Sequence, residues 1–214
     1  MRIIPTVFAL DRTEFLKRFE KIVKISEEIQ IDFMDGEFVK AKSVNLKDIP
    51  NLKKYNEKEF EAHLMVNEPI EWIEGLKKKG FKKIIFHYES FDKDDELLEL
   101  IDLIKKSKRE VWMAINPDTD IREIEDFLEE VKGILLMGVY PGKEGQSFIQ
   151  KTYGKIKRLK NIDENIKIQV DGGVNFNTIK KIKQAGADIV NVGGLVGKAD
   201  NPKEILSLLK KEAI

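Results

Sequence analysis

The sequence contains no cysteine among its 214 residues, which excludes disulfides, thiolate zinc sites and cysteine nucleophiles. It also has no apolar run of the roughly 18 residues that a membrane-spanning helix needs. Positive charge is not in excess, because 38 Lys and Arg balance 38 Asp and Glu, whereas a nucleic-acid-binding protein usually presents a basic face. The first residues lack the long apolar stretch of a secretory signal peptide. We therefore expect a cytoplasmic protein that binds neither nucleic acid nor membranes.

Short β-branched or apolar runs alternate with longer charged segments of helical period along the whole chain. The apolar runs predict strands near residues 2–8, 28–34, 60–66, 82–87, 110–115, 133–139, 165–171 and 188–193. The charged segments predict helices near residues 11–26, 46–54, 68–79, 92–107, 119–130, 151–161, 175–185 and 201–212. Eight such units predict an α/β protein with a single (β/α)8 TIM-barrel domain over residues 1–214. A doubly wound open sheet, which usually has fewer strands, is the alternative.

Polar side chains occur near the carboxyl ends of three predicted strands, where barrels carry their active sites. In the second strand, the period of two puts Gln30, Asp32 and Met34 on the face that points into the barrel. In the third, His63 occupies the corresponding face, and Asp171 ends the seventh strand. A buried carboxylate costs free energy unless it is paired or binds a metal. These residues therefore predict a functional site.

The second and seventh strands are expected to lie roughly opposite each other in the ring. Asp32 and Asp171 would then face each other across a cavity, where one carboxylate can remove a proton from one face of a planar intermediate and the other can return it on the opposite face. His63, next to Asp32, is a candidate ligand for a divalent metal. His87, at the end of the fourth strand, is compatible with substrate contact or with a packed supporting role.

Glycine-rich segments follow three late strands, at residues 141–146, 171–173 and 192–194. Backbone N–H groups of such turns can bind an anion, and barrels often hold phosphate after strands seven and eight. We expect phosphate to be bound by Gly172, Gly173, Gly193 and Gly194, with Gly142, Gly145 and Gln146 in a loop that closes over it.

Together these residues resemble the ribulose-phosphate 3-epimerase family. The resemblance covers nearly the whole chain, through residues 32–39, 63–66, 116–117, 141–149 and 170–174 in the family's order. It implies a (β/α)8 barrel that interconverts D-ribulose 5-phosphate and D-xylulose 5-phosphate at C3. It also implies a divalent zinc, iron, manganese or cobalt ion held by two His and two Asp, with the two Asp as the acid–base pair. Three methionines near the enediolate would be Met34, Met65 and Met137.

One metal ligand departs from the family pattern, because its first histidine falls at Gln30. The other ligands match at Asp32, His63 and Asp171. An amide oxygen is a weaker ligand than imidazole for these metals, so we expect the ion to be bound weakly or to be absent.

Further departures lie near the expected substrate site. The family's Ser-x-x-Ser reads Thr6 to Ala9, which puts Thr6 near the substrate, and Tyr140 precedes Pro141. Lys143 and Glu144 replace a Phe-Gly or Phe-Ala pair, and Gly194 stands where Ser is common.

The leading hypothesis is a C3 epimerase of a pentulose 5-phosphate, in which Asp32 and Asp171 exchange protons through a metal-stabilised enediolate. One alternative is a phosphosugar-binding barrel with a degraded metal site and no epimerase activity. Another is an epimerase of a related ketose phosphate, such as a hexulose 6-phosphate. A decarboxylase or synthase of the related barrel type fits poorly, because Met34 stands where those proteins need Lys. The expected partner is a small sugar phosphate, and we expect a homo-oligomer.

Overall fold

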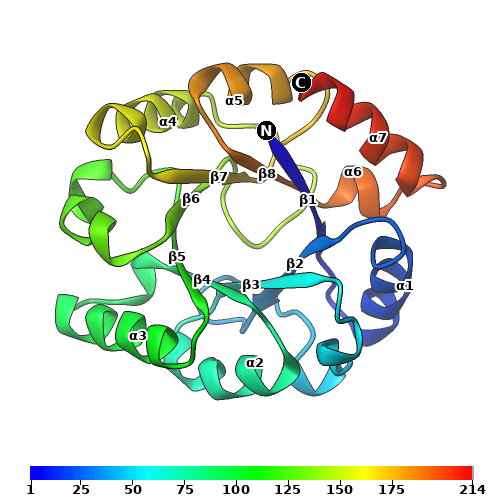
Figure 1. Ribbon diagram of the computed structural model, residues 1–214, viewed down its shortest axis with the longest axis horizontal. Coiled ribbons are helices and arrows are strands. Elements are labelled where there is room, and N and C mark those ends of the chain that lie inside the picture. Colours follow the sequence, from blue (N-terminus) through cyan, green and yellow to red (C-terminus); the bar gives the residue numbers. More distant parts are fainter. Residues whose placement is uncertain (214) are drawn as a thin grey trace.

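Eight parallel strands close into a barrel in the computed structural model, which describes residues 1–213 (Figure 1). The strands follow one another in chain order, and the last pairs with the first. They are β1 (Arg2–Val7), β2 (Glu28–Met34), β3 (Glu59–Met65), β4 (Lys83–His87), β5 (Glu110–Ile115), β6 (Gly133–Met137), β7 (Lys167–Asp171) and β8 (Ile189–Val192). This topology confirms the predicted (β/α)8 barrel.

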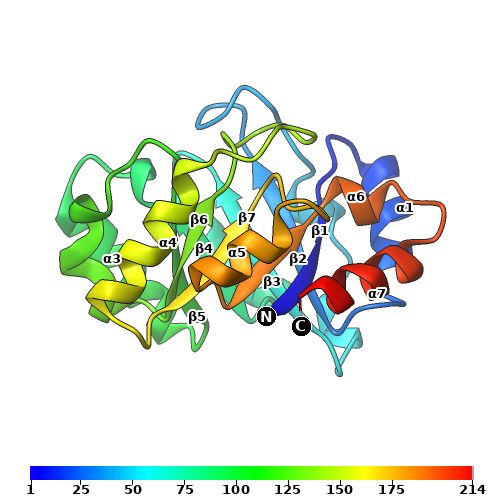
Figure 2. The same ribbon diagram turned by 90° about the horizontal axis from the view of Figure 1, so that it is seen from above.

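Helices surround the barrel on the outside (Figure 1). They are α1 (Arg12–Ile22), α2 (Ile73–Lys79), α3 (Asp94–Lys106), α4 (Lys151–Ile162), α5 (Ile179–Ala185), α6 (Gly194–Gly197) and α7 (Pro202–Glu212). Figure 2 shows the loops after β2 and β6 rising above one end of the barrel, with both marked chain ends near the other. Within residues 1–213, no helix is long and apolar enough to cross a bilayer.

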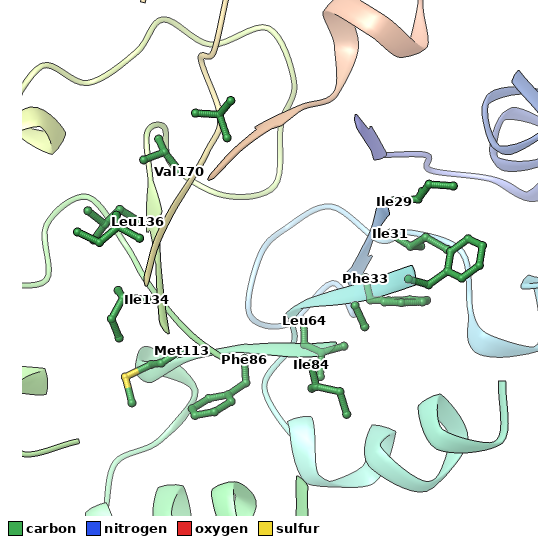
Figure 3. Packing of buried hydrophobic residues seen from close by; sticks show 14 of the residues in the cluster. Ile29, Ile31, Phe33, Leu64, Ile84, Phe86, Met113, Ile134, Leu136 and Val170 are labelled. Carbon is green, nitrogen blue, oxygen red and sulfur yellow. The ribbon is translucent and has the colours of Figure 1, made fainter. Parts of the chain in front are cut away.

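The strands form because their outward side chains bury apolar surface against the helices. On β2, Ile29, Ile31 and Phe33 point away from the barrel axis into this layer, and all three are fully buried (Figure 3). Burial of each such side chain contributes about 1.5–3 kcal/mol to the free energy of folding. The alternating positions of the same strand therefore face the interior, as the period of two predicts.

Four predicted helices differ in the structure. The one at 68–79 begins as a 3₁₀ turn, Pro69–Trp72, and becomes α-helical only from Ile73. Residues 46–54 form two 3₁₀ turns, Leu46–Asp48 and Leu52–Lys54, because Pro50 lacks an N–H group and keeps Ile49 extended, with ψ at 130°. The segment predicted at 119–130 is a 3₁₀ helix, Ile121–Glu130, which begins with an Asp120–Glu123 capping box. The helix predicted from residue 175 begins only at Ile179.

The barrel interior contains a buried polar network, formed by residues of β3, β4, β7 and β8, that the sequence did not predict. Lys83 Nζ lies 2.9 Å from Glu61 Oε2 and 3.5 Å from the centre of the Trp112 ring. Gln169 accepts a hydrogen bond from Lys83 through its carbonyl oxygen, and its Nε2 donates to Glu61 Oε1 at 2.6 Å and to Asn191 Oδ1 at 2.6 Å. Because these groups satisfy one another, they can be buried in the interior.

Candidate active site

A cavity of about 390 Å³ opens at the carboxyl ends of the strands. The predicted site residues that line it are Thr6, Asp32, His63, Met65, Met137, Gly142, Gly145, Gln146, Asp171, Gly172, Gly173, Gly193 and Gly194. Two predicted residues do not line it: Gln30 is buried beneath the carboxylates, and Met34 packs against Phe8 and Met65.

Strand register explains why the polar residues meet. Asp32 on β2 is the direct neighbour of His63 on β3, and Met34 is the neighbour of Met65. On the other side of β2, Gln30 is paired with Thr6 of β1. In the closed ring, β2 and β7 are separated by β1 and β8, so the two strands lie roughly opposite each other, as expected.

The two carboxylates converge on one imidazole nitrogen. His63 Nδ1 lies 3.1 Å from Asp32 Oδ1 and 3.4 Å from Asp171 Oδ2. Burial raises the pKa of Asp32 to about 6; the charge of Asp171 adds to this rise, whereas His63 and Gln30 oppose it. Burial alone would lower the pKa of His63, but its bonds to Asp171 and Asp32 raise it to about 9. At neutral pH the imidazole is therefore a cation that partly neutralises the two carboxyl groups.

Gln30 bridges the same carboxylates from below. Its Nε2 donates to Asp171 Oδ2 at 2.6 Å and to Asp32 Oδ1 at 2.9 Å, and lies 3.4 Å from Thr6 Oγ1. Its Oε1 lies 3.3 Å from Gln169 Nε2, so the carbonyl side of Gln30 faces an N–H₂ group whose closer acceptors are Glu61 and Asn191. An ammonium group only donates, so Lys83 fixes the carbonyl side of Gln169, and Gln169 in turn fixes the orientation of Gln30. The N–H₂ group of Gln30 therefore faces the carboxylates, and its carbonyl oxygen does not.

Three residues of the site fit a divalent metal ion. Asp32, His63 and Asp171 each offer one ligand atom, and these atoms lie within 4.8 Å of one another. Two carboxylate oxygens and an imidazole nitrogen form a suitable donor set for zinc and related ions. Gln30 would become a fourth ligand only if its amide turned over, which would break its hydrogen bonds to both carboxylates and turn its N–H₂ group towards that of Gln169.

His87 supports His63 from behind and does not line the cavity. The two Nε2 atoms are 3.0 Å apart, and His87 Nδ1 lies 3.1 Å from Glu89 Oε2. Burial is the main cause that lowers the pKa of His87, so the shared proton belongs to His63, which donates to His87. Glu89 also accepts from the backbone N–H of Asn116 at 2.6 Å and from the hydroxyl of Thr119. The structure thus assigns the supporting role to His87 and adds Glu89, which sequence reasoning missed.

The predicted glycine loops meet on the other side of the cavity. Gly173 has φ at +69°, and a Cβ there would lie 2.8 Å from Phe148 Cα, so only glycine fits. Gln146 donates to the backbone oxygens of Tyr140 at 2.6 Å and Lys143 at 2.9 Å, which holds the loop after β6 in shape. Within this loop, Glu144 forms ion pairs with Arg18 and Lys198 that sequence reasoning missed, although Glu144 was visible as a departure from the family pattern.

The protein is thus a (β/α)8-barrel protein whose strand ends bring two carboxyl groups and an imidazole into one cavity. A sequence model described as the "Ribulose-phosphate 3 epimerase family" matches residues 2–196. The chain belongs to this family.

Named relatives agree with this assignment, and a solved structure agrees with the fold. A ribulose-phosphate 3-epimerase of Schizosaccharomyces pombe is 30% identical over 217 residues, covering 100% of this chain and 94% of the relative. A ribulose-phosphate 3-epimerase of Bacillus subtilis is 31% identical over 212 residues, or 96% of each chain. A solved 3-hexulose-6-phosphate synthase superposes with a TM-score of 0.74 over 100% of both chains, at 16% identity, and therefore supports the fold alone.

Proposed function

We propose that this protein interconverts D-ribulose 5-phosphate and D-xylulose 5-phosphate by epimerisation at C3. Membership of the family supports an isomerase, as do relatives that carry the name ribulose-phosphate 3-epimerase. The observation that carries the proposal is the convergence of Asp32 and Asp171 on His63 within one cavity. A reaction that removes a proton from one face of a carbon and returns it on the other needs two such groups.

In the proposed reaction, one aspartate takes the C3 proton as a carboxylate and the other returns a proton as a carboxylic acid. The raised pKa of Asp32, about 6, suits a group that must exist in both states near neutral pH. The two roles exchange when the reaction runs in the opposite direction. Gln30 Nε2 orients both carboxyl groups, because it donates to one oxygen of each.

A divalent zinc, iron, manganese or cobalt ion on Asp32, His63 and Asp171 would stabilise the negative charge of the enediolate as a Lewis acid. We propose that this ion is bound weakly, because the family's fourth ligand is replaced by Gln30. Met65 and Met137 provide apolar surface beside the reacting carbon, and Met34 supports Met65 from behind.

The phosphate group is proposed to bind at the backbone of Gly172, Gly173, Gly193 and Gly194, beneath the loop that carries Gly142, Gly145 and Gln146. Thr6 lines the same cavity and is available to a substrate hydroxyl. A cytoplasmic location is also proposed, and the name of a rice relative, a cytoplasmic isoform of ribulose-phosphate 3-epimerase, supports it.

The test is a coupled assay for D-xylulose 5-phosphate, started with D-ribulose 5-phosphate, with chelator or with added Mn²⁺, Co²⁺ or Zn²⁺. Activity that depends on an added metal and on both aspartates supports the proposal. Turnover of a hexulose 6-phosphate alone would favour the related epimerase. Phosphosugar binding without turnover under every metal condition would favour a binding protein.

A further inference from the structure

An ion-pair cluster at the mouth of the cavity joins three separate elements. Glu144 lies in the loop between β6 and α4, Arg18 lies in α1, and Lys198 directly follows α6. Glu144 Oε1 is 2.8 Å from Arg18 Nη1, and Glu144 Oε2 is 2.9 Å from Lys198 Nζ. The Arg18 side chain is only 6% exposed, although its guanidinium is always charged. The cluster therefore contains one buried group, the Arg18 guanidinium, that is permanently positive.

The Glu144 carboxylate lies against the backbone that is proposed to bind phosphate. A Cβ added to Gly193 would lie 3.3 Å from Glu144 Oε1, and one added to Gly194 would lie 3.4 Å from it. The guanidinium is close by, because a Cβ on Gly197 would lie 3.7 Å from Arg18 Nη1. An anionic oxygen of the protein therefore already occupies this part of the cavity, next to two cations.

We propose that Arg18 and Lys198 bind the phosphate group of the substrate, and that Glu144 occupies the same two cations when phosphate is absent. This inference rests on the proposed function. Carboxylate and phosphate oxygens make the same charge-assisted bonds to a guanidinium. A phosphate monoester carries about −1.5 to −2 charges at pH 7, whereas Glu144 carries a single charge. The two anions repel each other at such short range, so the stronger one displaces the other.

The loop around Glu144 has a backbone that permits the exchange. Gly142 and Gly145 flank Glu144 with φ at +99° and +79°, and a Cβ on Gly145 would meet nothing within 4 Å. No helix or strand is assigned to residues 138–150. Arg18 also keeps a second partner, Glu14 Oε1 at 2.5 Å, one helical turn earlier in α1. The guanidinium therefore keeps one carboxylate partner, and with it its position, when Glu144 leaves.

The test is the dissociation constant of inorganic phosphate, measured by calorimetry on the whole chain at low ionic strength. Removal of the competing charge in Glu144→Gln should tighten phosphate binding by about two- to fivefold, the range expected for one partly exposed ion pair. Lys198→Ala should weaken binding by about the same factor, and should raise KM for the sugar phosphate in proportion. Lys198 is 61% exposed, so this variant is expected to fold normally.

The matched control is Glu14→Gln, which removes the other carboxylate partner of Arg18 but does not line the cavity. Its phosphate affinity should stay within about twofold of the unmodified protein, because the glutamine carbonyl can still accept a hydrogen bond from Arg18 and hold the guanidinium in place. Weaker phosphate binding in Glu144→Gln would overturn the inference, since Glu144 would then help to hold phosphate. Unchanged affinity in both Glu144→Gln and Lys198→Ala, together with normal epimerase turnover, would overturn it while leaving the proposed function intact.

Discussion

Gln30 shows how one side chain at the base of the site changes the expected metal chemistry. The family pattern puts a histidine there, and a glutamine oxygen was expected to be a poor substitute for it. In the structure the amide nitrogen faces Asp32 and Asp171, and the network through Gln169 holds it in that orientation. The two N–H bonds of the Gln30 amide thus donate to Asp32 and Asp171 from the position where a metal ligand was expected.

Replacement of Gln30 by histidine should tighten metal binding by at least about tenfold, because even supporting residues around a metal ion are worth 10–100-fold. The measurement is a titration of the apo-protein with Co²⁺ or Zn²⁺, followed by calorimetry or absorbance.

Gln30→Met is the matched control, because it removes the amide donor without adding a ligand. We expect no gain in metal affinity for Gln30→Met. Equal affinity in Gln30→His and the unmodified protein would show that position 30 does not limit metal binding.

At the scale of single elements, the connection from β4 to β5 stabilises the site through Glu89, which contacts His87 next to His63. Glu89 lies in the 3₁₀ turn Tyr88–Ser90 and binds His87, the N–H of Asn116 and the hydroxyl of Thr119. Burial would raise the pKa of Glu89, but the contact with His87 and these hydrogen bonds lower it below its usual 4.5. An acid with a lowered pKa stabilises the fold above its unfolded pKa, and this stability is lost as pH falls through the folded value.

Glu89→Gln should therefore cost more stability at pH 6 than at pH 4. Urea denaturation of both proteins at the two pH values gives the difference in free energy of unfolding. The same difference at both pH values would contradict the assigned contacts.

The tight turn after β7 depends on glycine in the left-handed region. A Cβ on Gly173 would lie 2.8 Å from Phe148 Cα, at a backbone φ of +69°. Gly173→Ala should lower the free energy of unfolding by about 1–3 kcal/mol. Gly154→Ala is the control within α4, where a Cβ meets nothing within 4 Å, and it should stabilise by about 0.5–1 kcal/mol. Thermal denaturation distinguishes the two, and equal effects would contradict the account of the turn.

Periodicity predicted the elements well where one face alone is buried against helices. On β2 the alternation assigned Ile29, Ile31 and Phe33 to the outside and Asp32 to the inside. The helix predicted across Pro50 was wrong, because the prediction gave more weight to the helical spacing of apolar residues than to the helix-breaking effect of proline. The orientation of Gln30 could not be predicted, because it depends on Gln169 and Lys83 from other strands, whose register the sequence does not reveal.

At the scale of the whole molecule, a count of eight βα units predicted the barrel, and the barrel then fixed where the strand ends converge. The Glu144 ion pairs could not be predicted in the same way, since they join α1, the loop after β6 and the segment after α6. The expected homo-oligomer stays a prediction, and light scattering coupled to size-exclusion chromatography gives the mass that tests it.

The central claim is that Asp32 and Asp171 exchange protons at C3 of a pentulose 5-phosphate. It is tested most directly by incubating D-ribulose 5-phosphate with the metal-supplemented protein in D₂O and following C3 by NMR. The unmodified protein should form D-xylulose 5-phosphate with deuterium at C3. Asp32→Asn and Asp171→Asn, both folded by circular dichroism, should each slow this conversion by at least about 100-fold. Conversion at the wild-type rate in either variant would contradict the account. So would a failure of the unmodified protein, with every metal tested, to exchange the C3 hydrogen of the substrate for deuterium.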